Sequence, residues 1–600
     1  MSDQETLQKA MQALKDGKKE LALKLLTQVA ESFSAKRMHE NAARIFEKAG
    51  FLAKDLSRLE DSLNLFEKAT LMYMRQSAED FYPEIVRLNI LAAETAVLYA
   101  EYGRSADFFF RAVDFAGDED EKDAITLRAV ESLENLADAR EEETKFKETI
   151  GLLKKISRLY YSLGDEELGE RINNRAIRVA QRWVDNAKEK SNHLEAGNAL
   201  GEIAQIMQAK DEFVEAAKLM LDAGEHYEAI DLFEKAGNIY DAAQEVYKFE
   251  RLTSARNQAL FKAAEAYMKL EGKPEVVAPL LVKAGDMFTE VKSPVKAKWA
   301  FKRASDLFAE LAEIAADASD INSEKTYLRF QAMCLKKWGS EEEAEEIYNE
   351  VINYFLSQAA MEEEQESKEA QALSLESAAS VLSEAGRKEE ALEQREKAVE
   401  IYVQLADTSA SAESPEESSR FYTKAADCSR SLGNPEREES FHWIASEKAE
   451  EAAKYYEDLE VPELATVWTR TAGLEALNID QQKVREKATE LLEKSAQGFK
   501  DAGETKEAFE DLFTVYETVF IYKRQGNKRK LNQIVKEMDE IARTTRDEGM
   551  LCTIAVLQAV QKDKYIAALL ALQEREDEIM DTRVRLRNLI KQGSEKYGTL

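Results

Sequence analysis

The chain has 600 residues, of which 44% are hydrophobic and 33% are charged, with only 23 glycines and 7 prolines. This length exceeds what a single hydrophobic core organises, so we expect either several domains or a repeat array. Because the good helix formers Ala, Glu, Leu and Lys replace glycine and proline, the composition predicts an almost wholly α-helical protein.

The charge is strongly negative and unevenly distributed. Lys and Arg number 83 against 116 Asp and Glu, a net charge of −33, which argues against nucleic acid or an anionic membrane surface as a default partner. Residues 521–600 differ, because 16 basic residues there exceed 12 acidic ones, and residues 1–520 are left with −37.

Cysteine usage and the amino terminus favour a cytoplasmic protein. The three cysteines are far apart and odd in number, so they cannot form a disulfide framework. The first twenty residues have no apolar signal core, and no stretch is long and apolar enough to predict an integral membrane segment.

A stripe of small, aromatic and small residues recurs along the chain at helical spacing. Positions i, i+4 and i+7 lie on one helix face, so two small residues let a neighbouring helix approach while the aromatic ring fills the space between. The stripe occurs at Ala42/Phe46/Ala49, Ser62/Phe66/Ala69, Ala229/Phe233/Ala236, Ala297/Phe301/Ala304 and Ser418/Tyr422/Ala425, and in related form at Ala344/Tyr348/Val351, Ala391/Arg395/Ala398 and Ala508/Leu512/Val515.

A glycine precedes several of these stripes by five residues. Gly224, Gly339, Gly386 and Gly503 stand where the previous helix should end, since glycine adopts a left-handed conformation at low cost. Each unit is therefore predicted to be a helical hairpin that must stack on its neighbours. Ser293-Pro294, Ser414-Pro415 and Asn434-Pro435 are predicted to begin further helices.

These features resemble the tetratricopeptide repeat, whose second helix carries A-x3-F-x2-A. The 34-residue register of that repeat is not kept, because the stripes centred on Phe46 and Phe66 are only twenty residues apart. Residues 216–247 look more like the irregular repeats of soluble NSF attachment proteins. The resemblance implies an all-α, right-handed α-solenoid of stacked antiparallel helical hairpins with irregular repeats; a long coiled coil is the alternative, and it lacks sustained heptads.

Composition suggests three segments. Residues 316–324 lose the apolar period and are the predicted hinge between two halves of the solenoid, 1–315 and 316–520. Residues 521–600 form a less acidic, more basic helical segment. The Ser- and Glu-rich stretch 407–419 is predicted to be a long flexible loop.

Templates for catalysis and for metal or cofactor binding find no match. The chain has no HExxH, no C-x-x-C, no phosphate-binding G-x4-G-K-[ST] and no G-x-S-x-G, so we expect no catalytic residues, no metal and no cofactor.

A binding role has more support. First helices of stacked hairpins line a groove that holds peptides or helical segments in tetratricopeptide proteins. By this resemblance, the partner-binding candidates are Asp211, Val214, Glu215, Lys218, Arg329, Phe330, Met333, Glu490, Glu493 and Lys494. An ordinary hydrophilic solenoid surface is the alternative interpretation.

A cluster of cations is a second candidate. Five occur within eight residues, and they could dock an acidic partner or this chain's own acidic solenoid, with an ordinary interhelix turn as the alternative. They are Lys523, Arg524, Lys528, Arg529 and Lys530. The sequence thus predicts a non-catalytic scaffold or adaptor that binds other proteins. The alternatives are an attachment-protein-like adaptor that recruits an ATPase to a helical complex, or a regulatory protein or enzyme with an unrecognised site.

Overall fold

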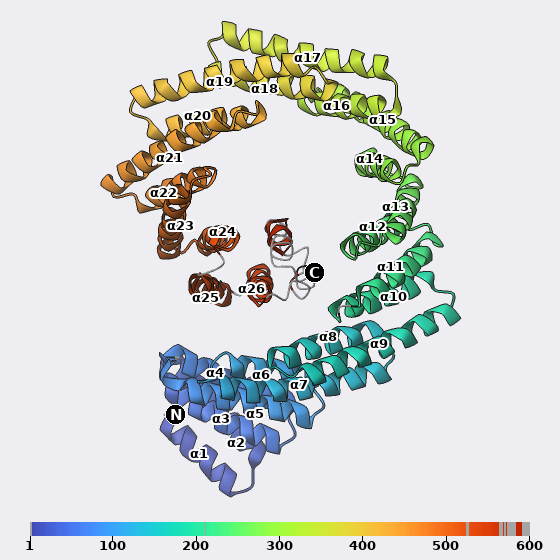
Figure 1. Ribbon diagram of the computed structural model, residues 1–600. Coiled ribbons are helices and arrows are strands. Elements are labelled where there is room, and N and C mark those ends of the chain that lie inside the picture. The colour runs from blue at the N-terminus through green and yellow to red at the C-terminus, as the bar shows by residue number, and fades with distance from the viewer. Residues whose placement is uncertain are drawn as a thin grey trace. The chain divides into compact units, whose positions relative to one another are not determined.

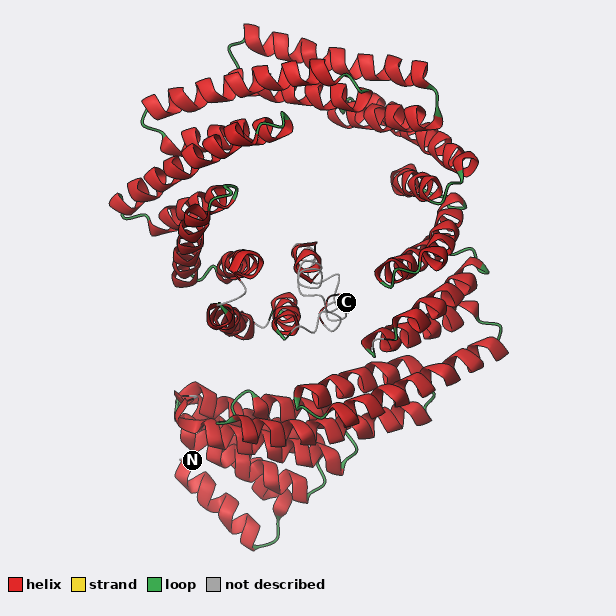
Figure 2. Ribbon diagram, in the orientation of Figure 1, coloured by secondary structure: helices red, strands yellow, loops and turns green. Residues whose placement is uncertain are grey.

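The computed structural model describes residues 3–77, 79–210, 212–523, 527–545, 547–562 and 584–590, together with positions 568, 572 and 582. Within these ranges every regular element is a helix, and short turns join the helices (Figure 2). The predicted all-α class is confirmed. None of the described helices is both long and apolar enough to cross a bilayer.

The chain divides into two compact units, Met1–Leu252 and Thr253–Leu600. The first unit contains α1 (Asp3–Lys15), α2 (Lys19–Ala35), α3 (His39–Asp55), α4 (Leu59–Ser77), the 3-10 helix η1 (Glu79–Phe81), α5 (Tyr82–Leu98), α6 (Tyr102–Val113), α7 (Glu119–Glu142), α8 (Phe146–Ser162), α9 (Glu166–Glu189), α10 (His193–Ala209), α11 (Phe213–Glu228) and α12 (Phe233–Phe249).

The second unit continues the same pattern of helices packed against their sequence neighbours (Figure 1). It contains α13 (Thr253–Met268), α14 (Pro274–Glu290), α15 (Pro294–Asp317), α16 (Ile321–Trp338), α17 (Glu341–Glu364), α18 (Lys368–Ala385), α19 (Lys388–Ser411), α20 (Pro415–Ser431), α21 (Pro435–Asp458), α22 (Pro462–Leu477), α23 (Gln482–Ala502), α24 (Thr505–Lys523), α25 (Lys528–Thr545) and α26 (Glu548–Gln561). The predicted hairpin solenoid is therefore confirmed.

Helix starts reveal a rule within the irregular repeats. In the second unit, α15, α17, α19, α21 and α23 start at 294, 341, 388, 435 and 482, each 47 residues after the last. The helices between them start at 274, 321, 368, 415 and 462, again at intervals of 47. In parts of the first unit, consecutive helices start 20 residues apart, as at 19, 39 and 59. Two repeat lengths, rather than one drifting length, explain why the sequence shows no constant register.

The turns share one conformation. A residue with positive φ stands two positions before most helix starts, which reverses the chain in a tight, repeated geometry. At every second turn from α15 to α22 it is a non-glycine residue, namely Ser319, Glu366, Glu413 and Glu460, each at φ 58°. At the alternate turns it is glycine, as at Gly386, with φ 93°.

The predicted turn glycines have a mixed outcome. Gly339, Gly386 and Gly503 end α16, α18 and α23 in the left-handed conformation, as predicted. Gly224 does not end a helix, because α11 continues to Glu228 and the left-handed residue is Asp231. The prediction at Gly224 was wrong because this glycine serves close packing inside a helix instead.

The close packing recurs at three places. A β-carbon on Gly50, Gly224 or Gly285 would lie 2.7, 2.2 or 2.5 Å from the ring of Phe66, Tyr240 or Phe301 in the following helix. In each case the glycine is the twelfth residue of its helix and the aromatic is the eighth of the next. Phe66 and Phe301 are the aromatic residues of predicted stripes, and they pack successive helices together as predicted. The stripe Ala229/Phe233/Ala236 was wrong, because it spans the turn between α11 and α12, and Tyr240 fills the space at Gly224 instead.

In the second unit the helices alternate between two layers. Figure 1 shows α16, α18, α20 and α22 on the inner side of this unit's curve and α17, α19, α21 and α23 on the outer side. The predicted hinge at 316–324 is the turn between α15 and α16, inside this unit. The long loop predicted at 407–419 was wrong, since α19 extends to Ser411 and α20 begins at Pro415.

Candidate functional site

The predicted groove residues of the first unit lie on α11. Asp211 falls outside the described residues. Glu215 and Lys218 are exposed and pair with each other at 3.1 Å, and Val214 is half-buried. Both charges are thereby balanced locally, and neither has a contact that points to a partner.

The predicted residues on α16 contribute to packing between repeats. Arg329 forms an ion pair with Glu384 of α18 and donates a hydrogen bond to Ser380 Oγ at 3.3 Å. Phe330 is 43% exposed, and its ring centroid lies 5.2 Å from that of Phe308. Met333 is half-buried. Phe330 is the member of this set with substantial free surface.

The last predicted set lies on α23. Lys494 pairs with Glu457 of α21 at 2.8 Å, and Glu493 pairs with Lys530 of α25 at 2.8 Å. Glu490 is exposed. Within the described residues, no ion pair or hydrogen bond joins the α16 set to the α23 set.

The structure does bring part of the groove set to the predicted cationic cluster. Lys528, Arg529 and Lys530 form the first turn of α25, and Lys530 reaches Glu493 across the space between α25 and α23. Lys523 is the last residue of α24, with a side chain outside the description, and Arg524 also lies outside the described residues. Glu493, predicted as a groove residue, and Lys530, predicted as a docking residue, therefore meet at α25.

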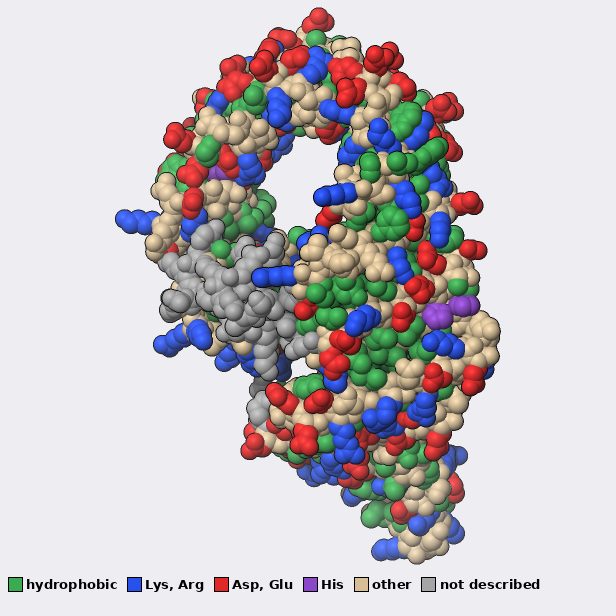
Figure 3. Space-filling model, turned by 45° about the vertical axis from the view of Figure 1, so that its right-hand side comes forward, with side chains coloured by type: hydrophobic (Ala, Val, Ile, Leu, Met, Phe, Trp, Pro, Cys, Tyr) green, Lys and Arg blue, Asp and Glu red, His purple; other side chains and the backbone are tan. Residues whose placement is uncertain are grey.

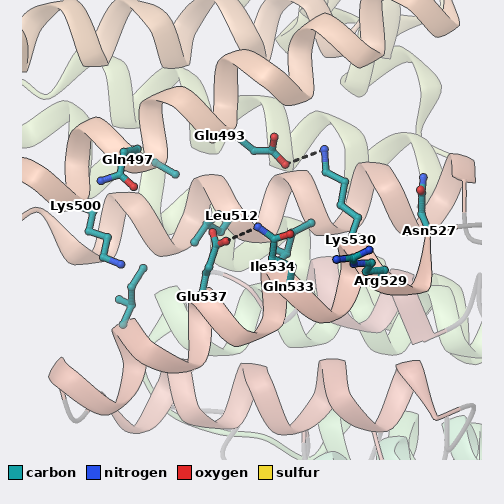
Figure 4. A pocket seen from close by; sticks show the side chains of 12 residues that line it. Glu493, Gln497, Lys500, Leu512, Asn527, Arg529, Lys530, Gln533, Ile534 and Glu537 are labelled. Carbon is teal, nitrogen blue, oxygen red and sulfur yellow. Dashed lines mark hydrogen bonds and ion pairs between the residues drawn. The ribbon is translucent and has the colours of Figure 1, made fainter.

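A cavity of about 850 Å³ opens at this place, and we call it the α23–α25 groove (Figure 4). Its lining combines polar groups on two facing helices with an apolar floor. The lining residues are Glu493, Ala496, Gln497, Lys500, Leu512, Asn527, Arg529, Lys530, Gln533, Ile534, Glu537 and Ile541.

Helical spacing explains why these side chains share the groove. Glu493, Gln497 and Lys500 stand at i, i+4 and i+7 on α23, and Lys530, Gln533 and Glu537 stand at i, i+3 and i+7 on α25, so each set shares one face of its helix. Gln533 and Lys500 were not among the residues predicted from the sequence, although this periodicity was visible. The sequence did not predict that α23 faces α25, because this depends on Leu512 of α24 lying between the two helices.

The charges along the groove are partly neutralised. Lys530 pairs with Glu493, Lys500 lies 3.4 Å from Glu540, and Gln533 Nε2 donates to Glu537 Oε1 at 3.0 Å. Arg529 is exposed and enters no ion pair within the described part of the chain. The groove thus offers a free guanidinium beside amides and aliphatic side chains, a combination suited to a peptide that carries a carboxylate and an apolar residue.

Catalytic chemistry finds little support in the described residues. They contain no group of three or more His, Cys, Asp or Glu residues that could hold a metal ion. All three cysteines are buried, and burial raises the pKa of the Cys334 thiol to about 12. A thiol with so high a pKa is a poor nucleophile at neutral pH.

Comparison with known proteins supports the repeat assignment. The family model described as soluble NSF attachment protein, SNAP, matches residues 167–278. This match confirms the resemblance to that family over a part of the chain from α9 to α14. No curated protein shows significant sequence similarity to the chain.

Solved helical-repeat structures are similar at low identity. Yeast Tom70 is 13% identical, with 89% of this chain and 99% of that chain covered and a TM-score of 0.24. A signal-transduction ATPase with a tetratricopeptide repeat sensor from Pyrococcus horikoshii is 16% identical, with coverages of 85% and 74% and a TM-score of 0.25. BtubC from P. vanneervenii is 12% identical, with coverages of 42% and 91% and a TM-score of 0.20.

Proposed function

We propose that this chain is a non-catalytic scaffold that binds a segment of another protein in the α23–α25 groove. The observation that supports this most directly is the groove itself, where Arg529, which pairs with none of the residues that the structure describes, lies beside amide groups and an apolar floor. A peptide carboxylate would pair with Arg529, and an adjacent apolar side chain would contact Leu512, Ile534 and Ile541.

The surrounding fold suits such a role. Stacked hairpins hold α23 and α25 rigidly, because the buried side chains of α23 to α26 form one continuous cluster that includes Phe513 and Tyr516. Because the helices that form the groove are already ordered, binding does not require a further loss of conformational entropy in the groove itself.

The experiment is affinity capture with full-length protein and two charge variants. Arg529→Glu places a like charge against an incoming carboxylate, while Lys388→Glu makes the same charge change at an exposed site on α19. We expect a stoichiometric protein partner whose affinity for Arg529→Glu is at least about tenfold weaker, and unchanged for Lys388→Glu. If both variants capture the partner protein equally, the α23–α25 groove is not its binding site.

A finer version is favoured by the family match over residues 167–278. In that version the chain is an adaptor of the attachment-protein kind, which holds a helical complex and recruits an ATPase to it. Immobilised full-length protein should then retain an ATPase that ATP hydrolysis releases. If retention of the ATPase does not depend on nucleotide, the adaptor version is wrong and only the general scaffold proposal remains.

A further inference from the structure

Helix α15 carries two large apolar side chains that the fold leaves in solvent. Val295 is 69% exposed and Trp299 is 67% exposed, among the highest values for apolar residues in the described chain. Together with Lys298 and Lys302 they stand at i, i+3, i+4 and i+7, and therefore share one side of the helix. We call this side the α15 face, and Lys292 lies in the turn just before it.

The packing of α15 does not require this exposure. Its opposite side buries Ala297, Phe301 and Ala304 completely or almost completely, and that side anchors the helix in the core. An exposed tryptophan next to an exposed valine contributes nothing to that core. Large apolar side chains left together in water commonly mark a contact surface.

The charged residues in the stretch of sequence around the α15 face are all positive. Residues 292–303, KSPVKAKWAFKR, contain five cations and no acid in a chain of net charge −33. Some of these cations are used inside the fold. Lys296 pairs with Glu265, Lys302 lies 2.5 Å from Asp306, and Arg303 donates to the carbonyl oxygens of Met268 and Leu270 at the end of α13.

Two lysines remain without such a role. Lys292 and Lys298 are both exposed, and neither enters an ion pair with any described residue. The α15 face therefore presents a Trp–Val pair beside two lysines that enter no ion pair with any described residue. On the face that Figure 3 draws, hydrophobic, basic and acidic side chains are intermixed.

The 47-residue repeat supplies an internal comparison. In α17, the positions equivalent to Val295, Lys298 and Trp299 are Glu342, Glu345 and Glu346, and all three are exposed. In α19 the equivalents are Glu389, Leu392 and Glu393. In α21 they are Glu436, Glu439 and Ser440, and in α23 they are Lys483, Glu486 and Lys487. Glutamate is therefore the commonest residue at these positions in the four later copies, and α15 is the one helix of the five with no acidic residue at any of them.

We propose that the α15 face binds the surface of an anionic lipid membrane. Tryptophan and valine would enter the interfacial region, and Lys292 and Lys298 would meet the lipid headgroups. A lipid surface fits better than a protein surface because the free cations are all lysines, which protein interfaces disfavour and anionic membranes attract. A protruding tryptophan also needs no preformed pocket in a fluid interface.

The net negative charge of the chain does not prevent this contact. At physiological ionic strength the Debye length is about 8 Å, so the glutamates of more distant helices are screened from the bilayer. The lysines of the α15 face lie at the contact itself and act at full strength. Binding should accordingly be weak, reversible and sensitive to salt.

The test uses full-length protein and vesicles of phosphatidylcholine with 30% phosphatidylserine, compared with phosphatidylcholine alone. Flotation at low and high salt gives the partition coefficient for wild type and for W299A and K292A/K298A. The matched controls are W443A, which removes another exposed tryptophan, and K388A/K454A, which removes two exposed lysines elsewhere. Quenching of wild-type fluorescence by brominated lipid tests insertion without any substitution.

We expect binding to the anionic vesicles only, with loss at high salt. W299A should weaken it at least about tenfold, K292A/K298A about thirtyfold, and the controls should match wild type. No binding to anionic vesicles at low salt, or binding unaffected by both variants, would overturn the proposal. So would self-association or retention of an acidic protein that depends on Trp299 while vesicles are ignored, since the face would then be a protein interface.

Discussion

Gly224 shows how a single residue can serve packing at the expense of helix propensity. It lies inside α11, where glycine is unfavourable by up to about 1 kcal/mol relative to alanine. It is retained there because the ring of Tyr240 occupies the space a β-carbon would need, at 2.2 Å. The tyrosine is fully buried and donates a hydrogen bond to Glu228, so the ring cannot easily move.

Replacing Gly224 with alanine should therefore destabilise the fold by about 1–2 kcal/mol, because the overpacking outweighs the gain in helix propensity. The control is Gly151→Ala in α8, where a β-carbon would meet nothing within 4 Å. That control should be neutral or slightly stabilising. Thermal unfolding of the two variants decides the matter, and equal midpoints would mean that the ring adjusts.

Asp511 of α24 is a second residue whose surroundings determine its behaviour. Its side chain is 1% exposed, accepts a hydrogen bond from Ser495 Oγ at 2.5 Å and lies 2.6 Å from Arg470 Nε. Burial raises the pKa of this carboxyl to about 6, and the Ser495 hydrogen bond and Arg470 offset only part of the effect. The carboxyl therefore titrates close to neutral pH.

The sign of the resulting pH dependence follows from the raised value. The folded state holds the proton more tightly than the unfolded state, whose pKa is near 3.8, so Asp511 stabilises the protonated fold and loses that contribution as pH rises through about 6. Relative to wild type, Asp511→Asn should gain about 2 kcal/mol between pH 4.5 and pH 8. Urea unfolding at both values measures the difference, and a constant difference would show that the carboxyl is not perturbed.

At the scale of the elements, the turns are the repeated feature that glycine content alone did not reveal. The left-handed position is glycine at Gly339, Gly386 and Gly433, but it is Ser319, Glu366, Glu413 or Glu460 at the alternate turns. This conformation is sterically unfavourable for a residue that has a β-carbon. The fold evidently offsets that cost with the packing of the flanking helices.

Substitutions at two equivalent turns should consequently have opposite effects. Glu413→Gly should stabilise the second unit by about 0.5–1 kcal/mol, and Gly386→Ala should destabilise it by about 1 kcal/mol. Thermal unfolding of each variant and of the double variant gives the comparison. If both changes lower stability, the side chain of Glu413 must contribute more than its backbone strain costs.

The same turns explain how far sequence reasoning could go. Helix class, hairpin stacking and the Ser-Pro and Asn-Pro helix starts follow from local composition and spacing, and the structure confirms them. The five residues FEKAG occur at both 46–50 and 233–237, but Phe46 is the eighth residue of α3 whereas Phe233 is the first of α12. A motif of five residues fits two phases of the repeat, and only the tertiary neighbour distinguishes them.

The candidate site was predictable only in part for a related reason. Glu493 and the cations Arg529 and Lys530 were selected from the sequence, but their meeting depends on α23 and α25 flanking Leu512 of α24. The α15 face was missed because the five cations of residues 292–303 were averaged into a strongly acidic segment of 520 residues. Comparing the 47-residue copies position by position would have found it, and that comparison needs the helix starts.

At the scale of the whole molecule, each helix packs mainly against the helices next to it in sequence, so stability is expected to be a sum of local terms. The division at Leu252 and Thr253 separates two sets of such contacts. Fragments 1–252 and 253–600 should therefore each be helical and unfold cooperatively. Amide exchange in each fragment should equal that in the intact chain, except in the helix next to the cut.

A fragment ending at residue 224 provides the matched control, because it cuts α11 and removes Tyr240 from its place against Gly224. It should lose exchange protection in α11, and less in α10, while earlier helices keep theirs. Loss of protection throughout 1–252 on separation from 253–600 would show that stability is shared across the division. The function of each unit could not then be studied in isolation, and the groove variants would have to be interpreted only in the intact chain.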